Sequence, residues 1–180
     1  MSRLLVCVLS LGVLACDPTV RLHVVPFGDS VFSHKESLPS LSAETILRGH
    51  VFTNQSFGGT TLAQAQEYWV PRIQNLAAAG FLDGACTPIS LGTNDAKDAR
   101  LEDILAIDEA LKGRALWLLP RAPAGATARD LILSAIPEGR VLDVPYSTAD
   151  GLHPDASNTG ASLLARTLLD TCEDQASLEG

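Results

Sequence analysis

Short apolar segments alternate with amphipathic segments along most of this chain, and this alternation constrains its fold more than any other feature. The expected strands cover residues 22–25, 50–53, 89–91, 115–119 and 141–144. The expected helices cover residues 42–48, 62–76, 101–111 and 128–136, and a last helix opens at Asn158. Strands that alternate with helices form right-handed crossovers and a parallel sheet covered on both faces. The sequence therefore predicts a three-layer α/β domain with a five-stranded parallel sheet.

Two prolines fall at these segments and should shape them. Pro71 lies within the helix expected at 62–76, where a proline removes a backbone hydrogen bond and crowds the preceding turn. We therefore expect that helix to kink or restart at Pro71. Pro88 cannot donate to a strand ladder, so we expect the third strand to begin only at Ile89.

Length and charge limit the classes of protein to which this chain can belong. Its 180 residues are enough for one ordinary domain with a buried core, and a monomer is the default expectation. It carries 13 Lys and Arg against 21 Asp and Glu, a net charge of −8, and no cluster of basic residues. An acidic protein without a basic surface binds nucleic-acid phosphates poorly, so we expect no nucleic-acid partner.

The first fifteen residues have the pattern of a signal peptide. Arg3 provides a positive charge, and the uncharged apolar run 4–14 follows it. Such a run is too short to cross a hydrocarbon core of about 30 Å as a helix, which argues against a permanent membrane span. A buried first strand or helix is the alternative, but residues 21–27 already supply a better first strand. We therefore expect residues 1–15 to direct export.

The residues leading to Cys16 add a second expectation about the N-terminus. Val13-Leu14-Ala15-Cys16 resembles the bacterial lipobox, in which cleavage before the cysteine is coupled to lipidation of its thiol, although Leu14 departs from the usual pattern. The resemblance implies that Cys16 is a lipid anchor and that the protein is held at the bacterial cell envelope. Secretion without lipid is the alternative. Residues 16–20 then form a tether, 21–172 the domain, and 173–180 a polar tail.

Polar residues follow the expected strands at the edge where open parallel sheets bind ligands. They are Ser30, Gly59, Asn94, Asp150 and His153. Taken singly, each has a plain structural explanation, because glycines and aspartates form turns and charged residues lie on surfaces. Taken together, they supply a nucleophile, candidate hydrogen-bond donors and an acid–base pair. This combination indicates acyl-transfer chemistry.

Four sequence blocks in a fixed order carry a family resemblance. The blocks are Phe27-Gly28-Asp29-Ser30, the segment 54–61 with its paired glycines, Leu91-Gly92-Thr93-Asn94-Asp95, and Asp150-Gly151-Leu152-His153-Pro154. The chain resembles the SGNH, or GDSL-type, hydrolases over roughly residues 21–169. Val31 departs from the Leu or Ile that is frequent there, and Gly58 competes with Gly59 for the second position. The resemblance implies a flavodoxin-like α/β/α sandwich.

The same resemblance implies a role for each residue of the site. Ser30 is the nucleophile, His153 takes its proton, and Asp150 binds the second ring nitrogen of that histidine. The backbone N–H groups of Ser30 and Gly59 and the side-chain amide of Asn94 form the oxyanion hole. The chain order Ser, Asp, His is also that of the α/β-hydrolases, but the chain contains no Gly-x-Ser-x-Gly elbow.

Other polar residues have simpler interpretations. Asp29 and Asp95 are expected to be structural and to bind loop amides. His23, His34 and His50 lack the paired spacing typical of zinc sites, so neither a metal nor any other cofactor is implied.

The expected activity is hydrolysis of a carboxylic ester, with a short acyl or O-acetyl group on a small molecule or glycan, through an acyl-enzyme on Ser30. An acyltransferase, a thioesterase or a lysophospholipase would use the same residues. A catalytically idle envelope protein that only binds a ligand is the alternative from another class.

Cys86 and Cys172 are a candidate disulfide. They remain after the signal segment and Cys16 are set aside, and export would carry them into a compartment that permits disulfides. Cys86 precedes the third strand and Cys172 ends the last helix, so both are expected at the end of the sheet opposite the site. Two free thiols are the alternative, and a Cα separation above about 7 Å would exclude the bond.

Overall fold

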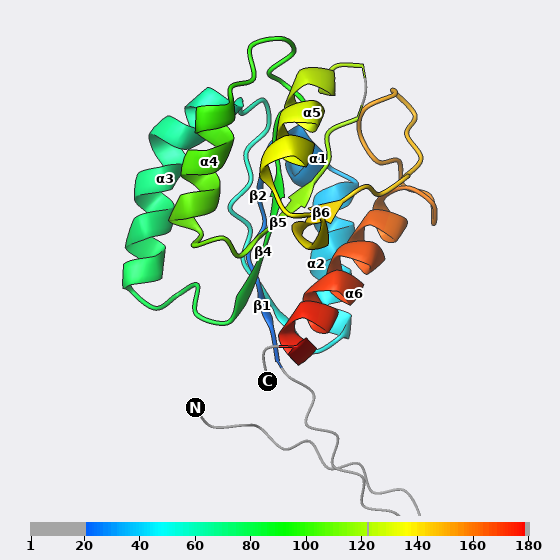
Figure 1. Cartoon of the computed structure of the whole chain (residues 1–180). Coiled ribbons are helices and arrows are strands. Elements are labelled where there is room, and N and C mark those ends of the chain that lie inside the picture. Colours follow the sequence, from blue (N-terminus) through cyan, green and yellow to red (C-terminus); the bar gives the residue numbers. More distant parts are fainter. Residues whose placement is uncertain (1–20, 122, 179–180) are drawn as a thin grey trace, which may run out of the picture.

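The computed structural model describes residues 21–121 and 123–178, and these residues contain a single parallel sheet. Its strands are β1 (His23–Val24), β2 (Phe27–Gly28), β3 (Val51–Phe52), β4 (Ala85–Ser90), β5 (Ala115–Leu118) and β6 (Val141–Leu142). The strand order is β3-β1-β4-β5-β6, with β2 also paired to β4 (Figure 1). Because every pairing is parallel, all strands end at the same edge of the sheet.

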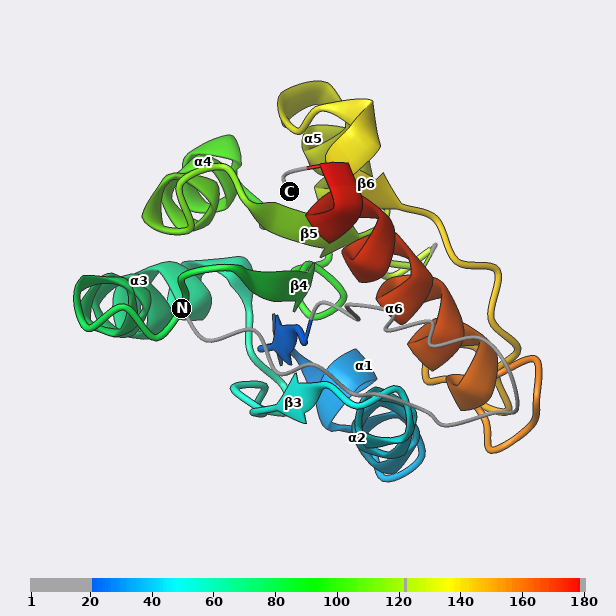
Figure 2. The ribbon, with the colours of Figure 1, turned by 90° about the horizontal axis from the view of Figure 1, so that it is seen from below.

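Helices cover both faces of this sheet. They are α1 (Ser30–Ser33), α2 (Ser37–Leu47), α3 (Leu62–Ala78), α4 (Leu101–Ala110), α5 (Ala126–Ala135) and α6 (Ala161–Leu178). Figure 2 shows α3 and α4 on one side of the sheet and α1, α2 and α6 on the other. Side chains of β5 alternate between the two cores, with Trp117 facing α3, α4 and α5, and Leu116 and Leu118 facing α1, α2 and α6. The prediction of a three-layer α/β/α fold is confirmed.

The count of strands differs from the prediction at Pro26 and Pro88. His23 of β1 pairs with Ala85, and Phe27 of β2 pairs with Ile89. This constant register brings Pro26 opposite Pro88, and neither residue has a backbone N–H to donate. The ladder is therefore interrupted, and a second short strand, β2, follows the strand predicted at 22–25, which makes six strands in all. The late start predicted at Ile89 is wrong, because β4 begins at Ala85 and accommodates Pro88 at the interruption.

Several helix boundaries also differ from the prediction. The helix expected at 42–48 begins earlier, at Ser37, because the backbone N–H of Leu38 already donates to the carbonyl of His34. The last helix begins at Ala161 rather than at Asn158. The helix does not restart at Pro71, since α3 is one helix from Leu62 to Ala78, opened by a capping box at its N-terminus.

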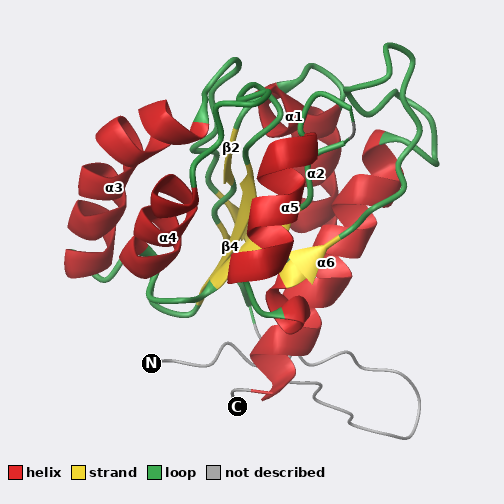
Figure 3. Ribbon diagram, turned by 45° about the horizontal axis from the view of Figure 1, so that its top comes forward, coloured by secondary structure: helices red, strands yellow, loops and turns green. Residues whose placement is uncertain are grey.

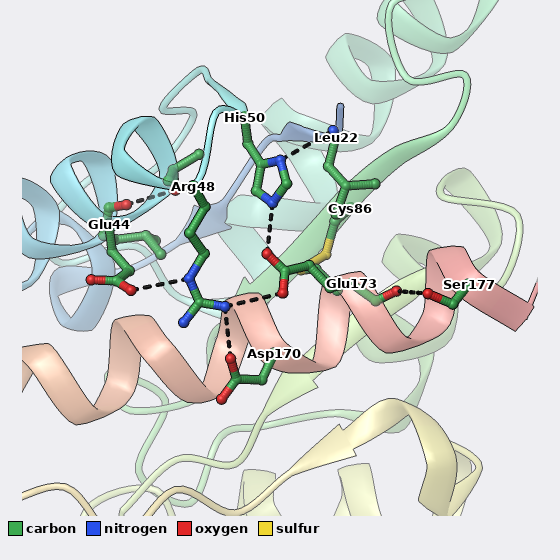
Figure 4. A network of polar contacts seen from close by, with 11 residues as sticks. Leu22, Glu44, Arg48, His50, Cys86, Asp170, Glu173 and Ser177 are labelled. Carbon is green, nitrogen blue, oxygen red and sulfur yellow. Dashed lines mark hydrogen bonds and ion pairs between the residues drawn. A yellow bond between two sulfur atoms is a disulfide. The ribbon is translucent and has the colours of Figure 1, made fainter. Parts of the chain in front are cut away.

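Residues 173–178, which were predicted to start a polar tail, are the last residues of helix α6. Helix α6 continues to Leu178 because its acidic side chains meet basic groups at the end of α2 (Figure 4). Glu173 accepts hydrogen bonds from His50 Nε2 at 2.8 Å and from Arg48 Nη1 at 3.2 Å. Arg48 also contacts Asp170 at 2.7 Å. Glu173 is thus hydrogen-bonded to two residues that lie more than a hundred positions away in the sequence.

The same end of the molecule holds the two cysteines. Cys86 and Cys172 form a disulfide, with Cα atoms 5.7 Å apart and a sequence separation of 86 residues. It joins the first part of β4 to α6, away from the edge at which the strands end (Figure 4).

The expected signal peptide at 1–15, the lipid anchor at Cys16 and the tether at 16–20 lie outside the described residues. Within residues 21–121 and 123–178, no helix is long and apolar enough to cross a membrane.

Candidate active site

Ser30 lies where β2 gives way to a helix. It follows the last residue of β2 by two positions and is the first residue of α1, at the edge where loops gather (Figure 3). Asp29 caps this helix by accepting a hydrogen bond from the backbone N–H of Val31 at 3.0 Å. A Cβ atom on Gly28 would lie 2.7 Å from the Phe32 ring and 3.0 Å from the carbonyl oxygen of Ser90, so only glycine fits at this turn. The turn therefore fixes the backbone of Ser30.

Asp29 is the buried support of this turn. It is fully buried, and Oδ1 also accepts the hydroxyl of Ser90 at 3.3 Å, whereas Oδ2 makes no hydrogen bond that meets the usual geometry within the described residues. Burial, partly offset by the hydrogen bond from Val31, raises the pKa of Asp29 to about 6. The carboxyl acts as a structural cap, as its place in the sequence suggested.

Asp150 and His153 form a close pair in the loop between β6 and α6. His153 Nδ1 lies 2.7 Å from Asp150 Oδ2. Asp150 Oδ1 accepts the backbone N–H groups of Leu152 at 2.9 Å and of His153 at 2.8 Å. The His153 side chain and these two N–H groups hold the pKa of Asp150 well below its usual range. The carboxylate is therefore ionised at neutral pH and favours the tautomer with the proton on Nδ1.

The second ring nitrogen of His153 is the atom that a base would use. Nε2 is buried and makes no hydrogen bond within the described part of the chain. Ser30 Oγ therefore does not hydrogen-bond to it in this structure. Such contacts are often formed only once substrate binds, so the unmade bond leaves Nε2 available as an acceptor.

The loop that carries this pair is braced at its base. Thr148 pairs with Pro154 across the loop. The backbone N–H of Ser147 donates to the carbonyl of Thr159 at 2.7 Å, and that of Asp155 donates to the carbonyl of Ser147 at 3.0 Å. These bonds close the segment on both sides of Asp150 and His153 and limit its freedom.

The two remaining candidate oxyanion donors lie in neighbouring loops. Gly59 has a φ of +77°, in the left-handed region that favours glycine, and is exposed. The Asn94 side-chain amide donates to the carbonyl of Thr60 at 3.1 Å, which places Asn94 beside the Gly59 loop. The backbone N–H of Phe57 donates to the carbonyl of Gly28 at 2.8 Å and ties this loop to the turn before Ser30. The structure thus brings the first three blocks together.

Asp95 fixes the loop that carries Asn94. Both of its carboxylate oxygens accept the backbone N–H of Leu62, at 2.9 and 3.1 Å. This contact joins the loop after β4 to the start of α3. Burial raises the pKa of Asp95, with the hydrogen bond from Leu62 opposing it. Its role is structural, as expected.

One residue of the site was missed by sequence reasoning. The ring of His34 stacks on the ring of His153, with centroids 4.5 Å apart and planes 9° from parallel. Both residues line an open hollow of about 280 Å³ that also includes Lys35, Glu36 and Asp155. Ser30 and His34 lie four residues apart, a spacing that places two residues on one side of a helix. This spacing could have indicated that His34 lies near the site.

Within the described ranges, no group of three or more His, Cys, Asp or Glu side chains is placed to hold a metal ion.

Solved structures with the same architecture are found among ester-cleaving proteins. A lipase/acylhydrolase from Enterococcus faecalis is 18% identical, with a TM-score of 0.57 over 86% of this chain and 96% of the other. A protein described as a GDSL-like lipase from Parabacteroides merdae is 14% identical, with a TM-score of 0.56 over 84% and 95%. The psychrotrophic esterase EstA from Pseudoalteromonas sp. is 13% identical, with a TM-score of 0.52 over 88% and 99%.

The chain has the fold of the SGNH hydrolases. No protein-family model matches the sequence, and no curated protein matches it. The likeness to these solved structures is therefore one of backbone fold. At sequence identities of 13–18% it shows the fold alone. Within this SGNH fold, Ser30 follows β2, Asn94 follows β4, and the Asp150–His153 pair lies between β6 and α6.

Proposed function

We propose that this chain is a serine hydrolase of the SGNH family that cleaves carboxylic esters through an acyl-enzyme on Ser30. The observation that carries the proposal is the Asp150–His153 pair. His153 Nδ1 lies 2.7 Å from the Asp150 carboxylate, and His153 Nε2 is buried with no hydrogen-bond partner in the described part of the chain. The resemblance of the fold to proteins described as lipases, acylhydrolases and an esterase supports ester chemistry.

The first half of the reaction forms the acyl-enzyme. Substrate binding brings Ser30 Oγ within reach of His153 Nε2, which takes the hydroxyl proton as Oγ bonds to the carbonyl carbon. The carbonyl π electrons move to oxygen, and the resulting oxyanion accepts hydrogen bonds from the N–H groups of Ser30 and Gly59 and from the Asn94 amide. The intermediate then expels the alkoxide, which takes the proton from Nε2.

The second half returns the enzyme to its starting state. Water gives a proton to Nε2 and attacks the acyl carbon, and Ser30 Oγ leaves with that proton. Asp150 stays ionised throughout and stabilises the imidazolium that forms twice in each cycle.

The exposure of the site favours short acyl groups. Gly59, Asn94 and Asp150 are all exposed, and the hollow beside His153 is open and holds only about 280 Å³. An exposed site with a hollow of this size would enclose little of a long acyl chain. Phe57, two residues before Gly59, exposes 56% of its surface and offers a flat apolar face of the kind that sugar rings stack on. We propose an acetyl or other short acyl ester, on a glycan or a small alcohol.

A panel of esters tests this function. Acetyl, butyryl and longer acyl esters, acetylated sugars, a thioester and a lysophospholipid are offered to the wild-type protein, Ser30→Ala and Ser42→Ala. We expect turnover of the short oxygen esters, its loss in Ser30→Ala, and normal turnover in Ser42→Ala. Preference for the thioester, the lysophospholipid or an added acceptor alcohol would instead indicate a thioesterase, a lysophospholipase or an acyltransferase, respectively. A folded protein without any turnover would favour a binding protein.

We also propose that the protein is exported and held at the cell envelope through lipid on Cys16. The Cys86–Cys172 disulfide supports an oxidising compartment. Cys16→Ser should abolish lipid attachment, measured by intact mass of membrane-extracted protein, and leave a folded domain. Wild-type protein that is soluble in the medium and cut elsewhere than before Cys16 would contradict the anchor and leave only export.

A further inference from the structure

The short helix α1 connects the proposed nucleophile to His34, whose ring stacks on the proposed base His153. Ser30 is its first residue, and His34 is the residue that caps its C-terminus. Val31 and Phe32, between them, are buried in the core, and the backbone N–H of Ser33 donates to the carbonyl of Asp29 at 3.1 Å. Because both ends of α1 are fixed, the positions of Ser30 and His34 are fixed relative to each other.

His153 is held along one edge by Asp150 but needs a second contact to fix its ring plane. A single hydrogen bond at Nδ1 allows the ring to swing about the axis of that bond. The side chain of Asp150 is 54% exposed and contacts His153 only through its edge. The parallel ring of His34, 4.5 Å away, lies against the face of His153. Edge and face contacts together fix both the direction and the plane of the ring.

The hydrogen bonding of His34 suits this role. The backbone N–H of Glu36 donates to His34 Nδ1 at 3.5 Å, a contact made by the tautomer with its proton on Nε2. A neutral aromatic face attracts a cation stacked on it, whereas a second imidazolium would repel it. The other charged groups around the hollow are Lys35, Glu36, Asp150 and Asp155. These groups include both signs of charge and none of them stacks on the ring of His153. The ring of His34 is the group that contacts its face.

We propose that His34 is a positioning residue for His153. Resting on the proposed function, the claim is that the neutral ring of His34 holds the plane of His153 and stabilises the imidazolium that forms when Nε2 takes the proton of Ser30. His34 contacts neither the ester nor Ser30 Oγ in this role, and it acts only through His153. The stack should therefore affect kcat and leave KM nearly unchanged.

Substitutions that separate ring shape from volume test this role. In the full mature chain, His34→Phe keeps a flat aromatic face, and His34→Leu fills a similar volume without one. We expect His34→Phe to retain kcat within about 3-fold, and His34→Leu to lower kcat by roughly 3- to 30-fold. KM for p-nitrophenyl acetate should change by less than about 2-fold in both, and thermal midpoints should stay within a few degrees of wild type. If His34→Leu does not fold, His34→Gln serves as the non-aromatic variant, with the same loss expected.

The outcomes separate this proposal from the proposed function. Wild-type kcat in His34→Leu would overturn the role of His34 and leave the esterase intact. Equal losses in the Phe and Leu variants, with lowered thermal midpoints, would also overturn it, because His34 would then only fill space. Absence of turnover in folded wild-type protein would overturn the proposed function and this role with it.

Discussion

Asp29→Asn should make the stability of the protein less dependent on pH. Asp29 is fully buried, and this burial raises its pKa from 3.8 to about 6. The folded state therefore holds the proton more tightly than the unfolded chain. Stability contributed by this proton is complete below about pH 4 and is lost as the pH rises through about 6. The upper limit of the loss is about 3 kcal/mol, at 1.36 kcal/mol for each tenfold change in proton affinity.

The asparagine side chain cannot ionise, yet its oxygen can still accept the N–H of Val31. Relative to wild type, the free energy of unfolding of Asp29→Asn should therefore rise by up to about 3 kcal/mol between pH 4 and 7.5. Urea unfolding followed by circular dichroism measures it, with the exposed carboxyl variant Asp98→Asn as the control. A difference between Asp29→Asn and wild type that does not change with pH would refute the reasoning.

Three further substitutions probe the oxyanion hole, the disulfide and the proposed sugar contact. Asn94→Ala should lower kcat about 10²- to 10³-fold with an unchanged thermal midpoint, and near-normal turnover would make Asn94 a turn residue only. Cys172→Ala should lower the free energy of unfolding by about 2–5 kcal/mol in urea titrations, to the value of reduced wild type. Equal stability of Cys172→Ala and non-reduced wild type would contradict the disulfide. Phe57→Ala should raise KM for acetylated sugars about 2- to 10-fold but not for p-nitrophenyl acetate, and equal effects on both would exclude stacking. Tyr68→Ala, at an exposed aromatic residue of α3, is the control for Phe57→Ala.

The parts of the fold that were predictable are those encoded locally. Each strand is a short apolar run, and each candidate site residue follows such a run, so parallel pairing alone places these residues at one edge. The Asp150–His153 contact is equally local, since three residues separate the partners. These features needed no knowledge of which strand lies beside which.

The parts that were missed depend on distant partners. Pro88 is tolerated inside β4 because the register sets it opposite Pro26, and register cannot be read from either segment alone. The acidic end of α6 is ordered because Glu173 meets His50, 123 residues away. The His34–His153 stack likewise joins residues brought together only by the packing of α1 against the loop before α6. Tertiary contacts override the local polarity of these segments.

Labelling with a fluorophosphonate, followed by intact-mass and peptide mapping, tests the central claim most directly. The reagent reacts with a serine hydroxyl only where a neighbouring base activates it. The account predicts a single adduct on Ser30 in the wild-type protein, no adduct in Ser30→Ala, and a strongly slowed reaction in His153→Ala. A folded wild-type protein that stays unlabelled, or an adduct on another residue, would contradict it.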